Sequence, residues 1–181
     1  MIQMILKNMM EDLWEAAKYL PFCVIIGIAL SIVIFKIECK KNWKKEQGWK
    51  TRGIRVCFVI YLLEVGMITF FSREPGSRRG IDWLLFSTWG TNAKNHAFVL
   101  ENILLFIPLG VLLPLKNFKF QRVQSCVLAG FYFSCGIEIM QLLTGRGFCQ
   151  LDDVVMNTLG TWIGFRLFCA VKKRFHILKG R

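Results

Sequence analysis

The sequence predicts an all-α fold, a polytopic membrane helical bundle of about five transmembrane helices. The chain has 181 residues, is 54% apolar and has a mean hydropathy of +0.43, which is too apolar for an ordinary soluble domain. It contains five apolar stretches that approach the roughly 20 residues a helix needs to cross a bilayer. Lys and Arg gather in alternate segments between these stretches, as they do in proteins that cross a membrane several times.

The amino-terminal segment, residues 1–18, is expected to be an amphipathic helix that lies on the membrane surface. Its apolar residues recur at helical spacing, and they are Ile2, Leu6, Met9, Leu13 and Ala17. A frayed tail is an alternative that this pattern leaves open. Because Glu11, Asp12 and Glu15 precede the first apolar stretch and no small-residue cleavage site follows it, we expect a membrane anchor there and not a removable signal peptide.

Residues 19–171 are expected to form a single transmembrane helical domain. Its predicted spans are 19–35, 54–72, 97–115, 123–143 and 153–171. Pro108 and Gly110 predict a kink in the third span, whose freed carbonyl is available to a polar site. Gly160 and Gly164 form a GxxxG pair in the fifth span, which predicts close approach to a neighbouring helix.

The distribution of Lys and Arg predicts an amino terminus outside and a carboxyl terminus inside, since basic residues in short loops stay on the cytoplasmic side. Segments 36–55, 116–122 and 172–181 hold eight, three and five of them, whereas the alternate segments hold seven together. Residues 172–181 are thus expected to be a basic cytoplasmic tail. An anionic leaflet accounts for the net charge of +12, so the charge does not indicate a nucleic-acid partner.

Most polar residues inside the predicted spans fall at one membrane depth. The third span opens with Glu101 and Asn102, the fourth closes with Glu138 and Gln141, and the fifth opens with Asp152, Asp153 and Asn157. An ionisable side chain in hydrocarbon costs at least a few kcal/mol, so such a cluster predicts a functional site. In the predicted orientation this site is a pocket open to the outside, and Arg73 and Arg146 supply cations from the adjoining loops.

Each of these residues also has a purely structural interpretation. Asp152 or Asp153 at a helix start can serve as an N-cap. The amides of the cluster can join helices through hydrogen bonds worth about 1 kcal/mol each. For Glu138 a functional role is favoured over a structural one, because a carboxylate at that depth requires a cation, a proton or a ligand.

Three other features lie outside this cluster. Glu64, near the middle of the second span, is expected to form a structural pair with Arg166. The seven cysteines show no CxxC spacing, and the five within or at the edge of the spans are expected to be small apolar fillers: Cys23, Cys57, Cys126, Cys135 and Cys169. Cys149 lies in an outer loop, where a thiol can react, although an incidental residue is the favoured interpretation. Segment 71–96 combines Gly, Ser and Arg with large apolar residues, and we expect it to fold onto the outer membrane interface as a lid.

Four short motifs occur in order within residues 54–171. They are ENILLFIPLG from Glu101 to Gly110, EIMQ with Glu138 and Gln141, Gly-Arg at 145–146, and Asp-x-x-x-Asn-x-x-Gly from Asp153 to Gly160. Together with Ser72 and Arg73, they resemble the VanZ-like family of bacterial membrane proteins. The resemblance implies a site made of Arg73, Asn102, Glu138, Gln141, Arg146, Asp153 and Asn157. Where further polar residues are expected between Arg146 and Asp152, this chain has Phe148, Cys149 and Leu151.

That family is named for a protein associated with resistance to teicoplanin, a lipoglycopeptide that acts on cell-wall precursors outside the membrane. The resemblance therefore implies a multi-pass protein of the bacterial plasma membrane. Its implied partners are membrane lipids and either a lipid-linked cell-wall precursor or the lipoglycopeptide. The first functional hypothesis is an outward pocket that binds a polar or cationic group and lowers the access of the antibiotic to its target.

Two other functional classes stay open. One is a membrane-embedded enzyme acting on a lipid-linked precursor, with Glu138 and either Asp152 or Asp153 as candidate catalytic acid and base. The other is a transporter or lipid-handling protein, which ranks last because the chain shows no internal repeat. The sequence assigns no cofactor, and its carboxylate spacing is not diagnostic of a metal site.

Overall fold

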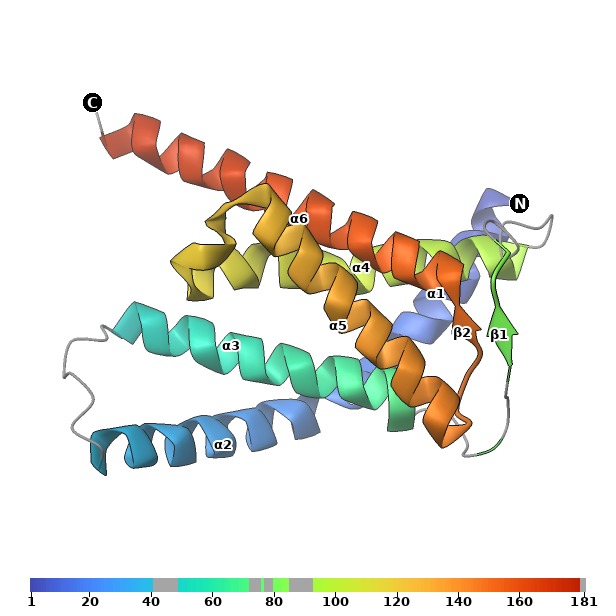
Figure 1. Ribbon diagram of the computed structural model, residues 1–181, viewed down its shortest axis with the longest axis horizontal. Coiled ribbons are helices and arrows are strands. Elements are labelled where there is room, and N and C mark those ends of the chain that lie inside the picture. The colour runs from blue at the N-terminus through green and yellow to red at the C-terminus, as the bar shows by residue number, and fades with distance from the viewer. Residues whose placement is uncertain (41–48, 72–75, 77–79, 85–92, 180–181) are drawn as a thin grey trace. The chain divides into compact units, whose positions relative to one another are not determined.

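A computed structural model covers the chain and describes the backbone of residues 1–40, 49–71, 76, 80–84 and 93–179 (Figure 1). Side chains are described over the same ranges, except for 38–40, 49–50 and 175–179. Helices account for nearly all of this part of the chain, which confirms the predicted all-α bundle. The chain divides into two compact units, one made of Met1–Met10 with Arg73–Arg181 (unit 1) and the other of Glu11–Ser72 (unit 2).

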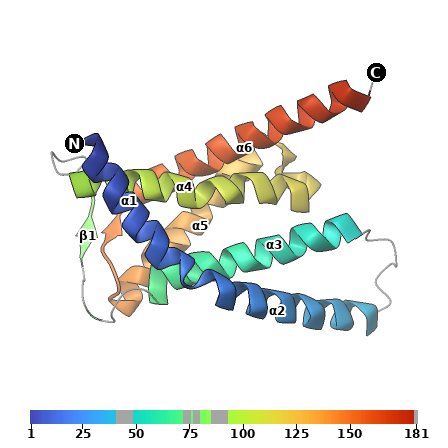
Figure 2. The same ribbon diagram turned by 180° about the vertical axis from the view of Figure 1, so that it is seen from behind.

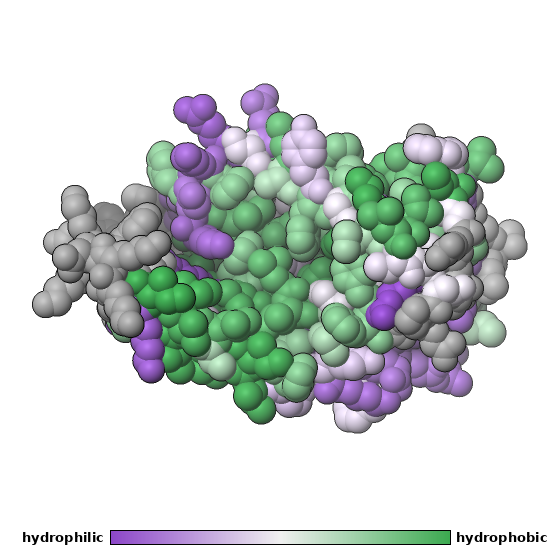
Figure 3. Space-filling view, turned by 60° about the horizontal axis from the view of Figure 1, so that its bottom comes forward, coloured by the Kyte–Doolittle hydropathy of each residue, from purple (hydrophilic) through white to green (hydrophobic). Residues whose placement is uncertain are grey.

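Within the described residues, five helices are long and apolar enough to cross a membrane. They cover Leu20–Ile37, Thr51–Phe71, Ala93–Lys116, Val123–Thr144 and Leu151–Arg174. Each overlaps one predicted span, so the prediction of five spans is confirmed. Large apolar side chains are exposed along these helices, as expected where lipid is the solvent (Figure 3).

The amino-terminal segment forms helix α1, Ile2–Ala17, which has no buried residue. The helical spacing of its apolar residues was therefore a correct guide to its secondary structure. Its location on a membrane surface stays a prediction, as does the orientation of the chain in the bilayer.

Unit 2 contains the last part of α1 and two longer helices, α2 at Leu20–Lys40 and α3 at Trp49–Gly66. Helix α3 continues into a π-helical turn at Met67–Phe71. The pair packs closely at Gly27, where a Cβ atom would lie 2.5 Å from Cγ1 of Ile60. Glu64 of α3 is a hydrogen-bond partner of the buried Cys23 thiol of α2. This contact gives Glu64 a neighbour within unit 2, and its predicted pairing with Arg166 of unit 1 stays a prediction.

Unit 1 is built on three helices, α4 at Ala93–Lys116, α5 at Val123–Thr144 and α6 at Leu151–Lys179. Helices α4 and α6 lie side by side in both views (Figures 1 and 2). They run in the same direction, because Ile103 approaches Gly160 and Ile107 approaches Gly164 one turn further along both helices. Helix α5 lies between them in sequence and packs against α6.

Glycines bring α4 and α6 into backbone contact. A Cβ atom on Gly160 would lie 2.2 Å from the carbonyl oxygen of Ile103, and one on Gly164 would lie 2.1 Å from that of Ile107. Gly110 of α4 makes the matching approach, since its Cβ would lie 2.1 Å from the carbonyl oxygen of Thr161. The close approach predicted from the GxxxG pair is confirmed, and α4 is the neighbouring helix.

Two prolines lie inside α4, and one of them removes a backbone hydrogen bond without ending the helix. The helix continues through Pro108 and Pro114, and the kink predicted at Pro108 stays a prediction. Pro114 has no backbone N–H, so the carbonyl of Gly110 has no partner within the helix. The Cys126 thiol of α5 donates to that carbonyl, with 3.8 Å between Sγ and O, and thereby ties α5 to α4.

The connection from α5 to α6 is held in place by a helix cap and two short strands. Gly145 adopts a left-handed conformation with φ of 64° and caps α5, after which the Arg146 N–H donates to the carbonyl of Gln141 over 3.0 Å. Strand β2, Cys149–Gln150, then pairs in parallel with β1, Ile81–Asp82. These restraints fix residues 145–150 immediately before α6 begins at Leu151.

Candidate functional site

The first contact of the candidate site joins α4 to α6. Nδ2 of Asn102 donates to Oδ1 of Asp153 over 2.7 Å. The glycine contacts described above make this possible, because they bring the two helix backbones together two turns further along α6. Both residues were predicted to belong to the site, and the structure brings them together.

Glu138 makes the second contact, from α5 to the connection that precedes α6. Its Oε2 accepts a hydrogen bond of 2.9 Å from the backbone N–H of Gln150 in β2. The side chain is only 2% exposed. A backbone N–H that points at a buried carboxylate stabilises its charged form, so this bond orients Glu138 and offsets part of its burial cost.

The third contact lies one helical turn further from the start of α6 than the other two. Nδ2 of Asn157 on α6 donates to Oγ of Ser134 on α5 over 2.9 Å, and the Thr161 hydroxyl donates to the backbone carbonyl of Asn157 over 3.1 Å. Asn157 is 3% exposed, and its buried Oδ1 receives no hydrogen bond from the described residues. Among the described residues, this oxygen therefore keeps unused capacity to accept a hydrogen bond.

These contacts arrange the cluster in two tiers. Asn102, Glu138 and Asp153 lie nearer the end of unit 1 where α6 begins, and we call them the outer tier. Ser134, Asn157 and Thr161 lie further from that end, and we call them the inner tier. Ser134 and Thr161, both fully buried, were not predicted from the sequence. A signal was present, because each lies four residues from a candidate, Ser134 before Glu138 and Thr161 after Asn157, and hence on the same helix face.

Other predicted residues lie near the cluster. Gln141 is buried three residues after Glu138, and Asp152 is buried in the first turn of α6. Because α6 begins at Leu151, both Asp152 and Asp153 lie inside its first turn. A carboxylate there interacts favourably with the positive end of the helix dipole. Arg146 is half-buried at the end of α5, and Glu101 is half-buried on α4.

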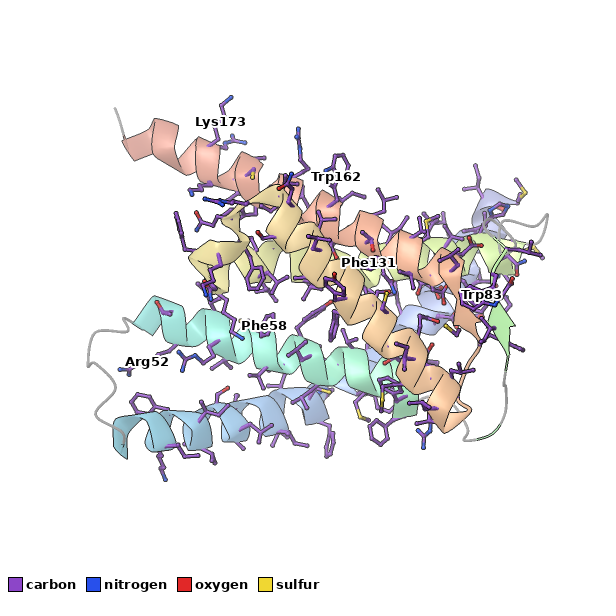
Figure 4. The ribbon with its side chains drawn as sticks, in the orientation of Figure 1. Arg52, Phe58, Trp83, Phe131, Trp162 and Lys173 are labelled. Carbon is purple, nitrogen blue, oxygen red and sulfur yellow. The ribbon has the colours of Figure 1, made fainter. Side chains whose placement is uncertain are left out.

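Part of the predicted site and lid lies outside the described residues. Arg73 belongs to that part, as do residues 72–75, 77–79 and 85–92 of the predicted lid, 71–96. Of the rest of that segment, residues 93–96 form the start of α4. Trp83 and Leu84 are both 72% exposed directly after β1 (Figure 4). Pairing of β1 with β2 attaches this exposed apolar segment to the strand that contacts Glu138.

The pKa of the Cys149 thiol is affected by the carboxylates of the outer tier. Burial raises its pKa, and the charges of Glu138, Cys135 and Asp153 raise it further. A thiol influenced by both Glu138 and Asp153 lies close to two carboxylates that come from different helices. Since a raised pKa disfavours the thiolate, Cys149 is expected to be less reactive than an ordinary thiol.

The chemistry available in the cluster is that of hydrogen bonding and carboxylate charge. Carboxylates, amides and hydroxyls converge from α4, α5 and α6, whose exposed side chains include many large apolar ones. In the part of the chain with described side chains, no three His, Cys, Asp or Glu residues are grouped so as to hold a metal ion.

Comparison with known proteins identifies the family. A family model described as VanZ/LLP1 matches residues 58–172. The protein VanZ of Enterococcus faecium is 25% identical to this chain over 115 residues, a segment that covers 62% of this chain and 65% of that protein. The chain thus spans slightly less than two thirds of the curated relative it matches. No solved structure matches. Since the family model covers more than half of the chain, this membrane protein belongs to the VanZ/LLP1 family.

Proposed function

We propose that this protein lowers the susceptibility of a bacterial cell to teicoplanin-type lipoglycopeptides, and that it does so through the two-tier polar cluster. Two contacts carry the proposal: Asn102 of α4 bonds Asp153 of α6, and Glu138 of α5 bonds the backbone of Gln150, just before α6 begins. Three helices thus bring polar side chains to one end of unit 1. The similarity to VanZ supports the biological setting, the bacterial plasma membrane.

The ligand of this cluster is a polar or cationic group of an amphipathic molecule. Carboxylates attract an ammonium group, and the buried Oδ1 of Asn157 accepts a hydrogen bond from an ammonium, hydroxyl or amide donor. An unsatisfied buried acceptor costs about 1–3 kcal/mol, so a donor that reaches it gains affinity. A lipid-linked cell-wall precursor and a lipoglycopeptide both carry such donors on a molecule anchored at the bilayer.

The predicted orientation places this cluster at the outer face, where the antibiotic acts. The start of α4, the end of α5 and the start of α6 then lie on the side away from the segments richest in Lys and Arg. Binding of a precursor headgroup at this depth would cover the part of the precursor that the antibiotic must reach.

An enzyme that modifies the precursor is the second candidate. It is favoured by the burial of Glu138 and Asp152, each 2% exposed, since buried carboxylates supply general acids and bases. Under this alternative the same cluster would change the chemical structure of the precursor instead of covering it.

The test is growth under teicoplanin of cells that express the wild type, Glu138→Gln, Asp153→Asn or Arg146→Ala. Asp12→Asn is the matched control, because it also exchanges a carboxylate for an amide but lies on the exposed helix α1. Protein levels in the membrane fraction are compared by immunoblot. We expect the two cluster variants, Glu138→Gln and Asp153→Asn, to lose protection, as well as Arg146→Ala at the end of α5, and the control to retain it.

Mass spectrometry of the lipid-linked precursors separates the two candidates. Protection with unaltered precursors supports binding, whereas altered precursors support the enzyme. Full protection in both Glu138→Gln and Asp153→Asn, at wild-type protein levels, would rule out a role for the cluster in resistance.

A further inference from the structure

Unit 1 is polarised in charge along its helices. Basic residues gather where α4 ends, α5 begins and α6 continues beyond the predicted span, and we call this surface the basic end. Its members are Lys116, Lys119, Arg122, Lys172, Lys173 and Arg174, all exposed. The acidic residues of unit 1 with described side chains are at the other end, and they are Asp82, Glu101, Glu138, Asp152 and Asp153.

The distance between the two ends matches a bilayer. Asp153 and Lys172 are separated by 19 positions on one continuous helix, which corresponds to about 28 Å at a rise of ~1.5 Å per residue. The hydrocarbon core of a bilayer is about 30 Å thick. When the acidic end lies at one membrane surface, the basic end therefore lies at the headgroup level of the other.

One lysine of the basic end is held in a fixed position. Nζ of Lys172 donates to Oε1 of Gln121 over 2.8 Å, and Nε2 of the same Gln121 donates to the carbonyl of Pro114 over 3.3 Å. Gln121 ends the short 3₁₀ helix η2, Phe118–Gln121, so one side chain bridges the end of α4 and the ammonium of α6. Lys172 also lies 5.8 Å above the ring of Phe168.

This arrangement leaves hydrogen-bonding capacity for an anion. An ammonium has three donors, and the bond to Gln121 uses one of them. Lys119 and Arg122 are exposed on either side of Gln121 in sequence, and a guanidinium binds the oxygens of a phosphate in a bidentate manner. The basic end thus combines a positioned ammonium with two further exposed cations.

Exposed apolar side chains at the same place favour a lipid over a free phosphate ion. Phe118, directly before Lys119, is 81% exposed, and Leu115 and Val123 on the flanking helices are also exposed. Aromatic residues beside Lys and Arg are typical of the boundary between headgroups and acyl chains. Lys173 projects from α6 in Figure 4, further along the same helix end.

We infer that the basic end is a binding site for an anionic phospholipid. Lys172, positioned by Gln121, and the cations Lys119 and Arg122 contact the headgroup phosphate, while Phe118 lies against the acyl chains. The site is independent of the resistance function proposed above, because it uses none of the residues of the polar cluster.

The test is native mass spectrometry of the purified full-length protein titrated with phosphatidylglycerol, with phosphatidylcholine as the zwitterionic comparison. We expect the apparent Kd for phosphatidylglycerol to rise about fivefold in Lys172→Gln, and further in the double variant Lys119→Gln with Arg122→Gln. Lys94→Gln is the matched control, since it removes an exposed lysine at the opposite end of α4. Its apparent Kd should change less than twofold.

Gln121→Leu is the decisive variant, because it keeps every charge and removes the amide that joins Lys172 to the end of α4. We expect it to weaken phosphatidylglycerol binding about threefold. Unchanged affinity in this variant would overturn the proposal, since a diffuse layer of positive charge would then explain the binding. Equal affinities of the wild type for the two lipids would overturn it as well.

Variants are compared when their size-exclusion profiles match that of the wild type. Lys172→Arg keeps the charge and should retain tight binding, which separates loss of the cation from misfolding. If Lys172→Gln does not fold, the double variant on the exposed side chains of Lys119 and Arg122 decides the question by the same criterion.

Discussion

The backbone contact between α4 and α6 leads to a prediction about Gly164. In Gly164→Ala the new Cβ atom would lie 2.1 Å from the carbonyl oxygen of Ile107 and 3.0 Å from Cα of Gly110. Both obstacles are backbone atoms, which cannot rotate away as a flexible side chain can. Ordinary van der Waals contact begins at 3.4 Å, so relief requires α4 and α6 to separate by about 1.3 Å, the difference between 3.4 and 2.1 Å.

Such a separation has an energetic and a structural consequence. Overpacking of a tight contact costs about 1–3 kcal/mol, and here the whole helix must move. The hydrogen bond between Asn102 and Asp153, now 2.7 Å, joins the same two helices and would be stretched beyond hydrogen-bond length by a shift of that size. Gly164→Ala should therefore destabilise unit 1 and also disturb the polar cluster.

The assay is thermal unfolding of the purified protein in one detergent, followed by circular dichroism. Gly136→Ala on α5 is the matched control, because a Cβ atom there would meet nothing within 4 Å. The control should be neutral or stabilised by up to about 1 kcal/mol, since alanine favours a helix more than glycine does. We expect Gly164→Ala to unfold at a clearly lower temperature. Equal unfolding temperatures for the two variants would refute the backbone contact between α4 and α6.

Two further predictions concern the thiol of Cys149 and the orientation of the chain. Because burial and nearby carboxylates raise the Cys149 pKa above the ordinary value of 9.0, its maleimide labelling should be slow near neutral pH and rise in the alkaline range. Glu138→Gln removes one of those charges, so the labelling profile should move to lower pH, whereas Asp12→Asn should leave the profile in place. Identical profiles for the wild type and both variants would show that Glu138 does not act on Cys149. The Lys and Arg distribution predicts that green fluorescent protein fused after Arg181 is fluorescent and that alkaline phosphatase fused there is inactive. The reverse pattern would place the polar cluster at the inner face and would remove the outward-facing site.

The sequence alone was sufficient to predict five helices that are long and apolar enough to span a membrane, and it selected the candidate residues by depth and helix face. Long apolar stretches define helices in lipid because every backbone polar group must be satisfied within its own segment. Counting along a helix then gives the depth and the face of each polar residue, which is how Asn102, Glu138 and Asp153 were selected. The GxxxG pair at Gly160 and Gly164 likewise indicated a tight interface.

Only the tertiary structure decided which residues meet. Periodicity within one helix does not specify the neighbouring helix, so the partner of Asp153 was open until α4 was found against α6. From the sequence, Gly110 was linked only to a kink with Pro108, which stays a prediction, and the structure adds that Gly110 completes the contact with Thr161 of α6. Ser134 and Thr161 were overlooked because a hydroxyl in a membrane helix normally bonds its own backbone, and only the packing of α5 on α6 gives Ser134 its contact with Asn157. Depth and face are local properties of a helix, whereas contact depends on how separate helices pack.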